Sequence, residues 1–165
     1  MLSYENFRDS IIRFQELLAR VVEFPLPTVC VFNGNAIAGG YILGLAHDFR
    51  VMHETNGAIC LSELKLGLPL PPPYMDMLAY KLKARVASKI AYGITLPQSE
   101  ALKDELIDET YSSVEQLHTQ LATFAKRYAG FGVHRSGIKT NKTNQFEKLL
   151  QSLRSFKFPP VFDAV

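Results

Sequence analysis

The segment Phe24–Tyr74 constrains the fold of this chain more than any other part of the sequence. Its first apolar run, Thr28–Phe32, is rich in β-branched residues and stops at Asn33-Gly34. The glycine pair Gly39-Gly40 then leads into a short apolar helical pattern over Tyr41–Ala46. Two further strand-like runs follow, at Phe49–Met52 and Ala58–Leu61. Strand, glycine turn, helix and strand in this order predict an α/β fold.

This order places main-chain amides and a carboxylate at the ends of neighbouring elements. Gly39 and Gly40 have no Cβ, so a ligand can approach their backbone closely. The N–H groups at a helix N-terminus are unpaired and partly positive, and they can stabilise an oxygen that becomes negative in a transition state. Glu63 follows the third run, where apolar neighbours disfavour its charged form, and it is a candidate base. The alternative is a simple glycine turn and a solvated glutamate.

The same residues resemble a motif of the crotonase superfamily, the enoyl-CoA hydratase and isomerase family. That motif is N-G-x-A-x-G-G, a short helix and a D-x-R-like strand. Here it reads Asn33-Gly34-Asn35-Ala36-Ile37-Ala38-Gly39-Gly40, then Asp48-Phe49-Arg50. The run L-S-E-L-K-L-G-L around Glu63, followed by prolines, is similar to 3-enoyl-CoA to 2-enoyl-CoA isomerases, especially the plant-type ones. The match is specific over roughly Phe24–Met75 and continues more weakly to about Leu150.

The resemblance implies a crotonase-like (ClpP/crotonase) spiral fold with one oxyanion-hole amide and one catalytic carboxylate in this chain. The amide at the position of Gly39 is one of two donors for the thioester oxygen, and Glu63 matches a catalytic glutamate. The hydratases carry another glutamate three residues beyond the donor, where this chain has Ile42. The expected substrate-binding residues are Ala38, Gly40, Ile42, Leu66, Leu68 and Pro71.

The implied reaction is a proton shift in an acyl-CoA thioester of fatty-acid β-oxidation. The amide pocket stabilises a dienolate while Glu63 removes the C2 proton and returns it at C4, so one carboxylate suffices. Hydration needs a second carboxylate to hold and activate water, and the apolar Ile42 cannot do this. We therefore expect an enoyl-CoA isomerase without a metal or redox cofactor, coenzyme A being part of the substrate.

The resemblance also implies that a part of the family fold is absent. Family members have a substantial N-terminal segment, with several strands and the other oxyanion amide, before the helix predicted at Ser3–Val22. We expect one partial crotonase-like domain, with an α/β part at 1–75 and a mainly helical part at 76–165. A fragment, a split protein and an inactive homologue are all compatible with this. An incomplete sheet exposes a strand edge, so we expect a homo-oligomer or another chain that covers it. The alternative function is a non-catalytic subunit of a larger, possibly mitochondrial assembly.

The composition excludes several other classes of protein. With 165 residues, 47% hydrophobic and 21% charged, the chain fits one globular domain. A net charge of +2 without a basic, aromatic-rich cluster gives no indication of nucleic-acid binding. No apolar run reaches membrane-spanning length and no signal-peptide core begins the chain, so it is not expected to be secreted. The resemblance implies the mitochondrial matrix or the peroxisome. Cys30 and Cys60 are predicted to be buried and reduced, and the four histidines have no ligand spacing.

The second half of the chain predicts a series of helices. Pro69 and Pro71–Pro73 are expected to form a rigid loop beside Glu63. Helices are then predicted at Tyr74–Lys83, Ala84–Tyr92, Ser113–Ala129 and Ile138–Leu153, with a short helix opening at Pro97. The resemblance to the family implies a strand at Leu106–Asp108. The lysines of the last helix, Lys139, Lys142 and Lys148, are interpreted as a solvated face rather than as partners of coenzyme A phosphates.

Overall fold

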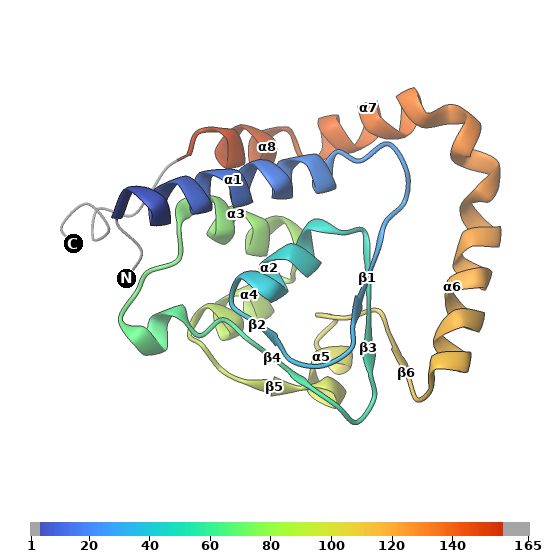
Figure 1. The fold of residues 1–165 in the computed structure, drawn as a ribbon, viewed down its shortest axis with the longest axis horizontal. Helices are drawn as coiled ribbons and strands as arrows, with labels where there is room; N and C mark the ends of the chain where they lie inside the picture. Colours follow the sequence, from blue (N-terminus) through green and yellow to red (C-terminus); the bar gives the residue numbers. More distant parts are fainter. Residues whose placement is uncertain (1–3, 157–165) are drawn as a thin grey trace.

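The computed structural model describes residues 4–156, in which helices surround two small β-sheets (Figure 1). The first sheet has the order β1-β3-β6 and is parallel throughout; its strands are β1 (Val29–Phe32), β3 (Phe49–His53) and β6 (Glu109–Tyr111). The second sheet has the order β2-β4-β5; its strands are β2 (Ala36–Ile37), β4 (Ala58–Cys60) and β5 (Leu96–Pro97). In that sheet β2 and β4 are parallel and β5 is antiparallel to β4.

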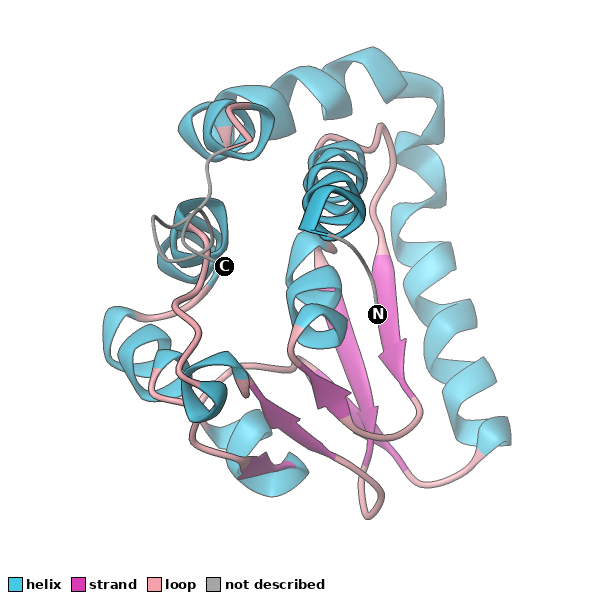
Figure 2. Cartoon of the chain, turned by 60° about the vertical axis from the view of Figure 1, so that its left-hand side comes forward, coloured by secondary structure: helices cyan, strands magenta, loops and turns pink. Residues whose placement is uncertain are grey.

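The helical bounds are α1 (Tyr4–Val22), α2 (Gly39–Ala46), α3 (Pro72–Lys81), α4 (Ala84–Ala91), α5 (Gln98–Lys103), α6 (Val114–Tyr128), α7 (Arg135–Gln145) and α8 (Glu147–Arg154), with 3-10 turns η1 (Glu63–Leu66) and η2 (Ala129–His134). Helices α1, α2, α3 and α8 form one packed group, whereas α6 stands apart from them (Figure 1). Helix α1 contacts α2 and α8, and α3 contacts the same two helices. Figure 2 shows α6 standing beside the sheet that contains β1.

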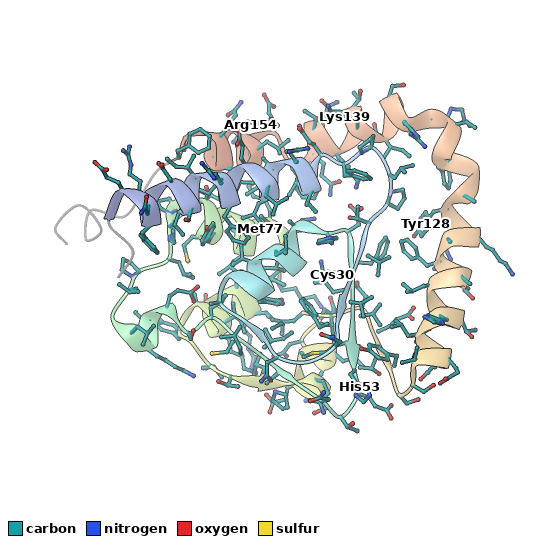
Figure 3. The ribbon with its side chains drawn as sticks, viewed as in Figure 1. Cys30, His53, Met77, Tyr128, Lys139 and Arg154 are labelled. Carbon is teal, nitrogen blue, oxygen red and sulfur yellow. The ribbon has the colours of Figure 1, made fainter. Side chains whose placement is uncertain are left out.

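The core lies where α1, α2, α3 and α8 meet the sheets. Fully buried side chains there include Leu18, Tyr41, Met77 and Leu149, and Met77 is labelled in Figure 3. Helix α2 lies close to β1 because Gly44 has no side chain: a Cβ on that residue would stand only 2.1 Å from the Phe32 ring. Close packing of this kind is sensitive to a single added methyl group.

The predicted α/β fold is confirmed, with strand bounds that differ by one residue from those expected. β1 begins one residue later than predicted, β3 ends one residue later and β4 ends one residue earlier. The strand predicted at Leu106–Asp108 is wrong, because β6 begins only at Glu109. The amides of Leu106 and Ile107 are bonded to the Ala101 carbonyl at the end of α5, at 2.8 and 3.4 Å, so they are not available for strand pairing.

The prolines after Glu63 open a helix instead of continuing a loop. Pro71 is the N-cap of α3, and Pro72 and Pro73 are its first two residues. Proline is tolerated there because the first amides of a helix have no partner within the helix. The rigid-loop prediction is therefore correct only up to about Leu70.

The last predicted helix is divided in two, and one of its lysines is not solvated. Phe146 separates α7 from α8, and its buried ring lies beneath the Lys81 ammonium group at 4.3 Å. Lys139 and Lys148 are exposed as predicted. Lys142 is only 8% exposed, so its assignment to a solvated face is wrong.

The Asp48 carboxylate joins three segments of the chain. Its Oδ2 accepts hydrogen bonds from the Thr28 amide at 2.7 Å and from the Thr28 hydroxyl at 2.9 Å. The same oxygen lies 2.6 Å from the Lys142 ammonium group, which also donates to the Leu26 carbonyl at 2.9 Å. This network attaches α7 to the start of β1 and to the residue that precedes β3.

β1 is an edge strand, as expected for an incomplete sheet. Within residues 4–156 it pairs with β3 alone. Phe124 and Tyr128 of α6 pack against Phe49 with ring centroids 4.8 and 5.7 Å apart, and Tyr128 is labelled in Figure 3. No side chain of α6 is fully buried. Association with another chain stays a prediction.

The network around Asp48 predicts that Lys142 is important for stability. Methionine in place of Lys142 keeps the length of the side chain but leaves Asp48 without its opposite charge. Removing one partner of a mostly buried ion pair is strongly destabilising, and we expect the free energy of unfolding to fall by about 3 kcal/mol. Urea unfolding followed by circular dichroism measures the change.

The matched control is Lys139→Met, because Lys139 is an exposed lysine in the same helix. Surface substitutions of this kind typically change stability by about 0.5 kcal/mol or less. An equal effect of the two substitutions would show that the Asp48 ion pair does not stabilise the fold.

Candidate active site

The N-terminus of α2 presents two unpaired main-chain amides. The N–H of Ala38 donates to the Cys60 carbonyl at 2.8 Å, and its carbonyl accepts from the amides of Tyr41 and Ile42 at 3.0 and 3.2 Å. In the part of the chain that the structure describes, the N–H groups of Gly39 and Gly40 meet no acceptor. Two such amides at a helix start can bind an oxygen that gains negative charge.

Ala38 adopts a backbone conformation that is unfavourable for a residue with a side chain. Its φ of 52° and ψ of −128° lie in a region normally occupied by glycine. Backbone strain of this size costs on the order of 1–3 kcal/mol and is typical of functional sites. Here the conformation connects β2, which is held to β4, with the first turn of α2, and so it orients the Gly39 amide.

Glu63 begins η1, three residues beyond the end of β4. Its side chain is half-buried, and Oε2 is fully buried with no hydrogen-bond partner in the described residues. Burial raises the pKa of Glu63, and a hydrogen bond with its own main-chain amide opposes that rise. A carboxyl group with these properties holds a proton more readily than an exposed glutamate, which suits a general base.

Tyr74, in the first turn of α3, adds a second unpaired group. The residue is 4% exposed, and its hydroxyl has no partner among the described residues. Burial raises the pKa of Tyr74, and the negative charge of Glu63 raises it further. The two side chains therefore lie close enough to interact electrostatically.

Phe14 of α1 connects this pair to the glycine turn. Its ring makes an edge-to-face contact with Tyr74 at a centroid distance of 6.1 Å. A Cβ built on Gly39 would lie 3.5 Å from the same ring. The structure thus brings together three separate segments, represented by Phe14, Gly39 and Tyr74. Glu63 is linked to them through its electrostatic effect on Tyr74. Sequence reasoning missed the roles of Phe14 and Tyr74, because an aromatic residue in an apolar helical pattern looks like any other core residue.

The expected substrate-binding residues have different environments. Ala38 is half-buried and Gly40 is exposed, both at the start of α2. Ile42 is 0% exposed within the core, and Pro71 is also buried. Leu66 is 73% exposed on η1. Their binding roles, like the catalytic roles of Gly39 and Glu63, stay predictions.

Leu68, one of the predicted binding residues, lines a hollow. The hollow has a volume of about 300 Å³ and lies between η1, α3 and α4. Its lining consists of Leu64, Leu68, Leu70, Met75, Ser88, Ala91 and Tyr92. An apolar lining next to the segment that bears Glu63 fits a hydrocarbon chain better than a charged ligand.

The described residues contain no cluster of three or more His, Cys, Asp or Glu side chains that could hold a metal ion. Their helices are also too short or too polar to cross a membrane. Both cysteines among them are free thiols; Cys60 is buried as predicted, whereas Cys30 is only half-buried.

Comparison with curated proteins finds relatives that share the isomerase name. Enoyl-CoA delta isomerase 3 of Arabidopsis thaliana is 35% identical over 101 residues, which is 61% of this chain and 41% of that protein. The mitochondrial enoyl-CoA delta isomerase 1 of Mus musculus is 28% identical over 153 residues, which is 86% of this chain and 53% of that protein. The chain therefore spans about half the length of the curated relatives it matches.

Solved structures show the same fold. A crystal structure of an enoyl-CoA hydratase from Mycobacterium ulcerans matches 99% of this chain with a TM-score of 0.83 at 23% identity, over 70% of that structure. Human mitochondrial delta3-delta2-enoyl-CoA isomerase matches 94% of this chain with a TM-score of 0.79 at 22% identity, over 63% of that structure. The model of the enoyl-CoA hydratase/isomerase family matches residues 3–157, and with this the chain belongs to that family, the crotonase superfamily.

Proposed function

We propose that the protein containing this chain is an enoyl-CoA isomerase, which moves the double bond of a 3-enoyl-CoA thioester to the 2-position. The observation that carries the proposal is the half-buried carboxylate of Glu63, whose Oε2 has no partner, combined with two free amides at the start of α2 in the described residues. Relatives named as enoyl-CoA delta isomerases support it.

The amides act on the thioester carbonyl in this proposal. The N–H of Gly39, assisted by that of Gly40, donates to the thioester oxygen as it gains negative charge. Stabilising this oxygen acidifies the α carbon and favours the dienolate. Because the two amides have no other acceptor among the described residues, no existing hydrogen bond has to break before the substrate binds.

Glu63 transfers the proton. Its carboxylate removes a proton from C2, becomes a carboxylic acid, and returns the proton at C4. The double bond moves from C3–C4 to C2–C3, and no atom is gained or lost. One group can serve as base and then as acid when its pKa lies near the working pH. The raised pKa of Glu63 moves the group in that direction.

The residue at position 42 separates isomerisation from hydration. Adding water to a 2-enoyl-CoA requires a second polar group that holds the water molecule. Ile42 is fully buried and apolar, so it supplies neither a donor nor an acceptor. Excluding water also protects a dienolate from side reactions.

Cofactors and location follow from the same chemistry and relatives. A proton shift needs no metal and no redox group, and coenzyme A enters as part of the substrate. Because relatives named as isomerases carry peroxisomal and mitochondrial designations, we expect this protein in the peroxisome or the mitochondrial matrix. Another copy or another chain is expected to cover the free edge of β1.

The proposal predicts a large loss of activity in Glu63→Gln. Glutamine keeps the shape of the side chain but cannot accept the C2 proton, and we expect kcat for isomerisation to fall about 10²–10⁴-fold. In the wild-type protein, kcat/KM should decrease as the pH falls through the pKa of Glu63, because only the carboxylate form is a base. The assay gives the complete natural protein a 3-enoyl-CoA and a 2-enoyl-CoA and follows both products.

Glu54→Gln is the control, because Glu54 is an exposed glutamate in the loop between β3 and β4. Its isomerase activity should match that of the wild type. Hydration faster than isomerisation would overturn the proposal. Inactivity of the wild-type protein in both assays would favour a non-catalytic crotonase-like subunit.

Burial of Glu63 also predicts that the stability of Glu63→Gln depends on pH. A raised pKa in the folded protein means that the folded state holds the Glu63 proton more tightly than the unfolded state. The wild type therefore loses stability as the pH rises from the usual glutamate range through the raised pKa. Glutamine does not titrate, so the variant should be more stable than the wild type at neutral pH.

Thermal unfolding at several pH values checks this expectation. The difference in stability between Glu63→Gln and the wild type should shrink as the pH falls below the usual range of a glutamate carboxyl group. Glu54→Gln, at an exposed position, should follow the wild type throughout. A variant less stable than the wild type at neutral pH would show that the Glu63 charge is stabilised in the folded protein.

A further inference from the structure

Two polar atoms, one in η1 and one in the first turn of α3, are buried without hydrogen-bond partners in the described residues. They are Oε2 of Glu63 and the hydroxyl oxygen of Tyr74. Buried polar side-chain atoms are usually hydrogen-bonded, and each exception calls for an explanation. One of these atoms is an acceptor without a donor, and the other belongs to a hydroxyl that can donate.

The Tyr74 ring is held in place by its surroundings. Its main-chain amide donates to the Pro71 carbonyl at 2.9 Å, inside a helix start made of consecutive prolines. The edge-to-face contact with Phe14 fixes the plane of the ring. Because the ring has little freedom, the direction of its hydroxyl is set by the fold.

The main chain of Glu63 is held in place by hydrogen bonds. Its carbonyl accepts from the Leu68 amide at 3.0 Å and also from the amide of Gly67, whose left-handed conformation closes η1. The main chain on both sides of the site is therefore fixed. The carboxylate can still rotate about the bonds of its own side chain.

The protonation states of the two groups suit a hydrogen bond from the Tyr74 hydroxyl to the Glu63 carboxylate. Glu63 raises the pKa of Tyr74, in addition to the effect of burial, so the hydroxyl keeps its proton throughout the physiological range. A protonated hydroxyl is a donor, and an ionised carboxylate is a strong acceptor. A hydrogen bond to a charged group is stronger than one between neutral groups.

We infer that the Tyr74 hydroxyl is the hydrogen-bond donor that positions the Glu63 carboxylate through Oε2. In this inference, the carboxylate rotates about its side-chain bonds until these two buried, unpaired atoms meet, and the contact satisfies both. The other carboxylate oxygen is then the one that takes the substrate proton. Tyr74 acts through Glu63 and is a positioning residue. The inference rests on the proposed isomerase function of Glu63.

This role opposes the effect of burial on Glu63. Burial favours the neutral acid, whereas a hydrogen bond from Tyr74 favours the ionised carboxylate. The hydroxyl therefore keeps the base ionised at a lower pH than burial alone would allow. Removing the hydroxyl should raise the pKa of Glu63 while leaving the shape of the site almost unchanged.

The test compares Tyr74→Phe with Tyr111→Phe in the complete natural protein. Tyr111 is a matched control because it is also 4% exposed, and its hydroxyl donates to the Phe32 carbonyl in the first sheet. Carbon-13 NMR of glutamate-labelled protein follows the carboxyl titration, and the Glu63 signal is assigned by its loss in Glu63→Gln. We expect Glu63 to titrate at higher pH in Tyr74→Phe and at the wild-type pH in Tyr111→Phe.

Kinetics provide the second measurement. On the acid side of the profile, kcat/KM of Tyr74→Phe should be about tenfold lower than that of the wild type, the ratio expected for loss of one hydrogen bond to a charged group. KM should change little, because Tyr74 does not contact the substrate. Tyr111→Phe loses a structural hydrogen bond, so it should unfold at a lower temperature without moving the acid side of the profile.

The two measurements separate the inference from the function it rests on. If Tyr74→Phe leaves the Glu63 titration unchanged, the inference is wrong whatever the activity. If the titration moves but the wild-type protein does not isomerise 3-enoyl-CoA, the contact between Tyr74 and Glu63 is supported and the proposed function fails. A lower stability of Tyr74→Phe with an unmoved titration would assign the hydroxyl a purely structural role.

Discussion

The hydrogen bonds between Thr28 and Asp48 join the two chain segments at the start of the parallel pair β1 and β3, from which the chain leads to the glycine turn of the candidate site. The Thr28 amide and hydroxyl donate to the Asp48 carboxylate, and the Asp48 amide in turn donates to the Thr28 hydroxyl at 3.1 Å. Directly after these residues, Val29 pairs with Phe49, which begins the parallel register of β1 and β3. A parallel pair has no tight turn to define its register, so a side-chain contact at its start has particular influence.

This register determines where the glycine turn lies. β1 ends at Phe32, and only a short connection separates it from β2, whose Ile37 pairs with Cys60 of β4. Ala38 must then turn sharply enough to start α2, and its strained backbone results from this restriction. The strain at Ala38 and the unpaired atoms of Glu63 and Tyr74 are unfavourable features within one small region. Their concentration there, where a ligand would bind, agrees with the general occurrence of such features at functional sites.

The sequence predicts the parts of this structure that depend on local patterns. Apolar, strand-like runs located β1, β3 and β4 to within one residue, and the glycine pair located the start of α2. Contacts between distant segments were not predictable in the same way. Nothing in the helical pattern around Lys142 distinguishes it from Lys139, because its partner Asp48 lies 94 positions away. Similarly, the prolines before Tyr74 indicate a break in structure but not that the break is a helix start.

The candidate site shows the same division between local and distant information. Gly39 and Glu63 stand out because their neighbours along the chain create the free amide and the apolar surroundings. Tyr74 and Phe14 become relevant only when α1 and α3 pack together, since both belong to apolar patterns that predict core positions. Residues that act through another side chain carry little signal in a single sequence.

The balance between burial and hydrogen bonding at Glu63 has a direct meaning for a proton shift. A group that takes a proton at C2 and returns it at C4 must exist readily in both states, so neither an exposed carboxylate nor a fully buried acid is suited to both steps. Partial burial moves the pKa of Glu63 upward from the ordinary glutamate value. In the inferred arrangement, the Tyr74 hydroxyl donates to the carboxylate and limits that rise. A hydratase faces a different requirement, because it must also hold water. In the proposed mechanism the apolar residue at position 42 leaves Glu63 as the single catalytic carboxylate, which matches a reaction that moves one proton.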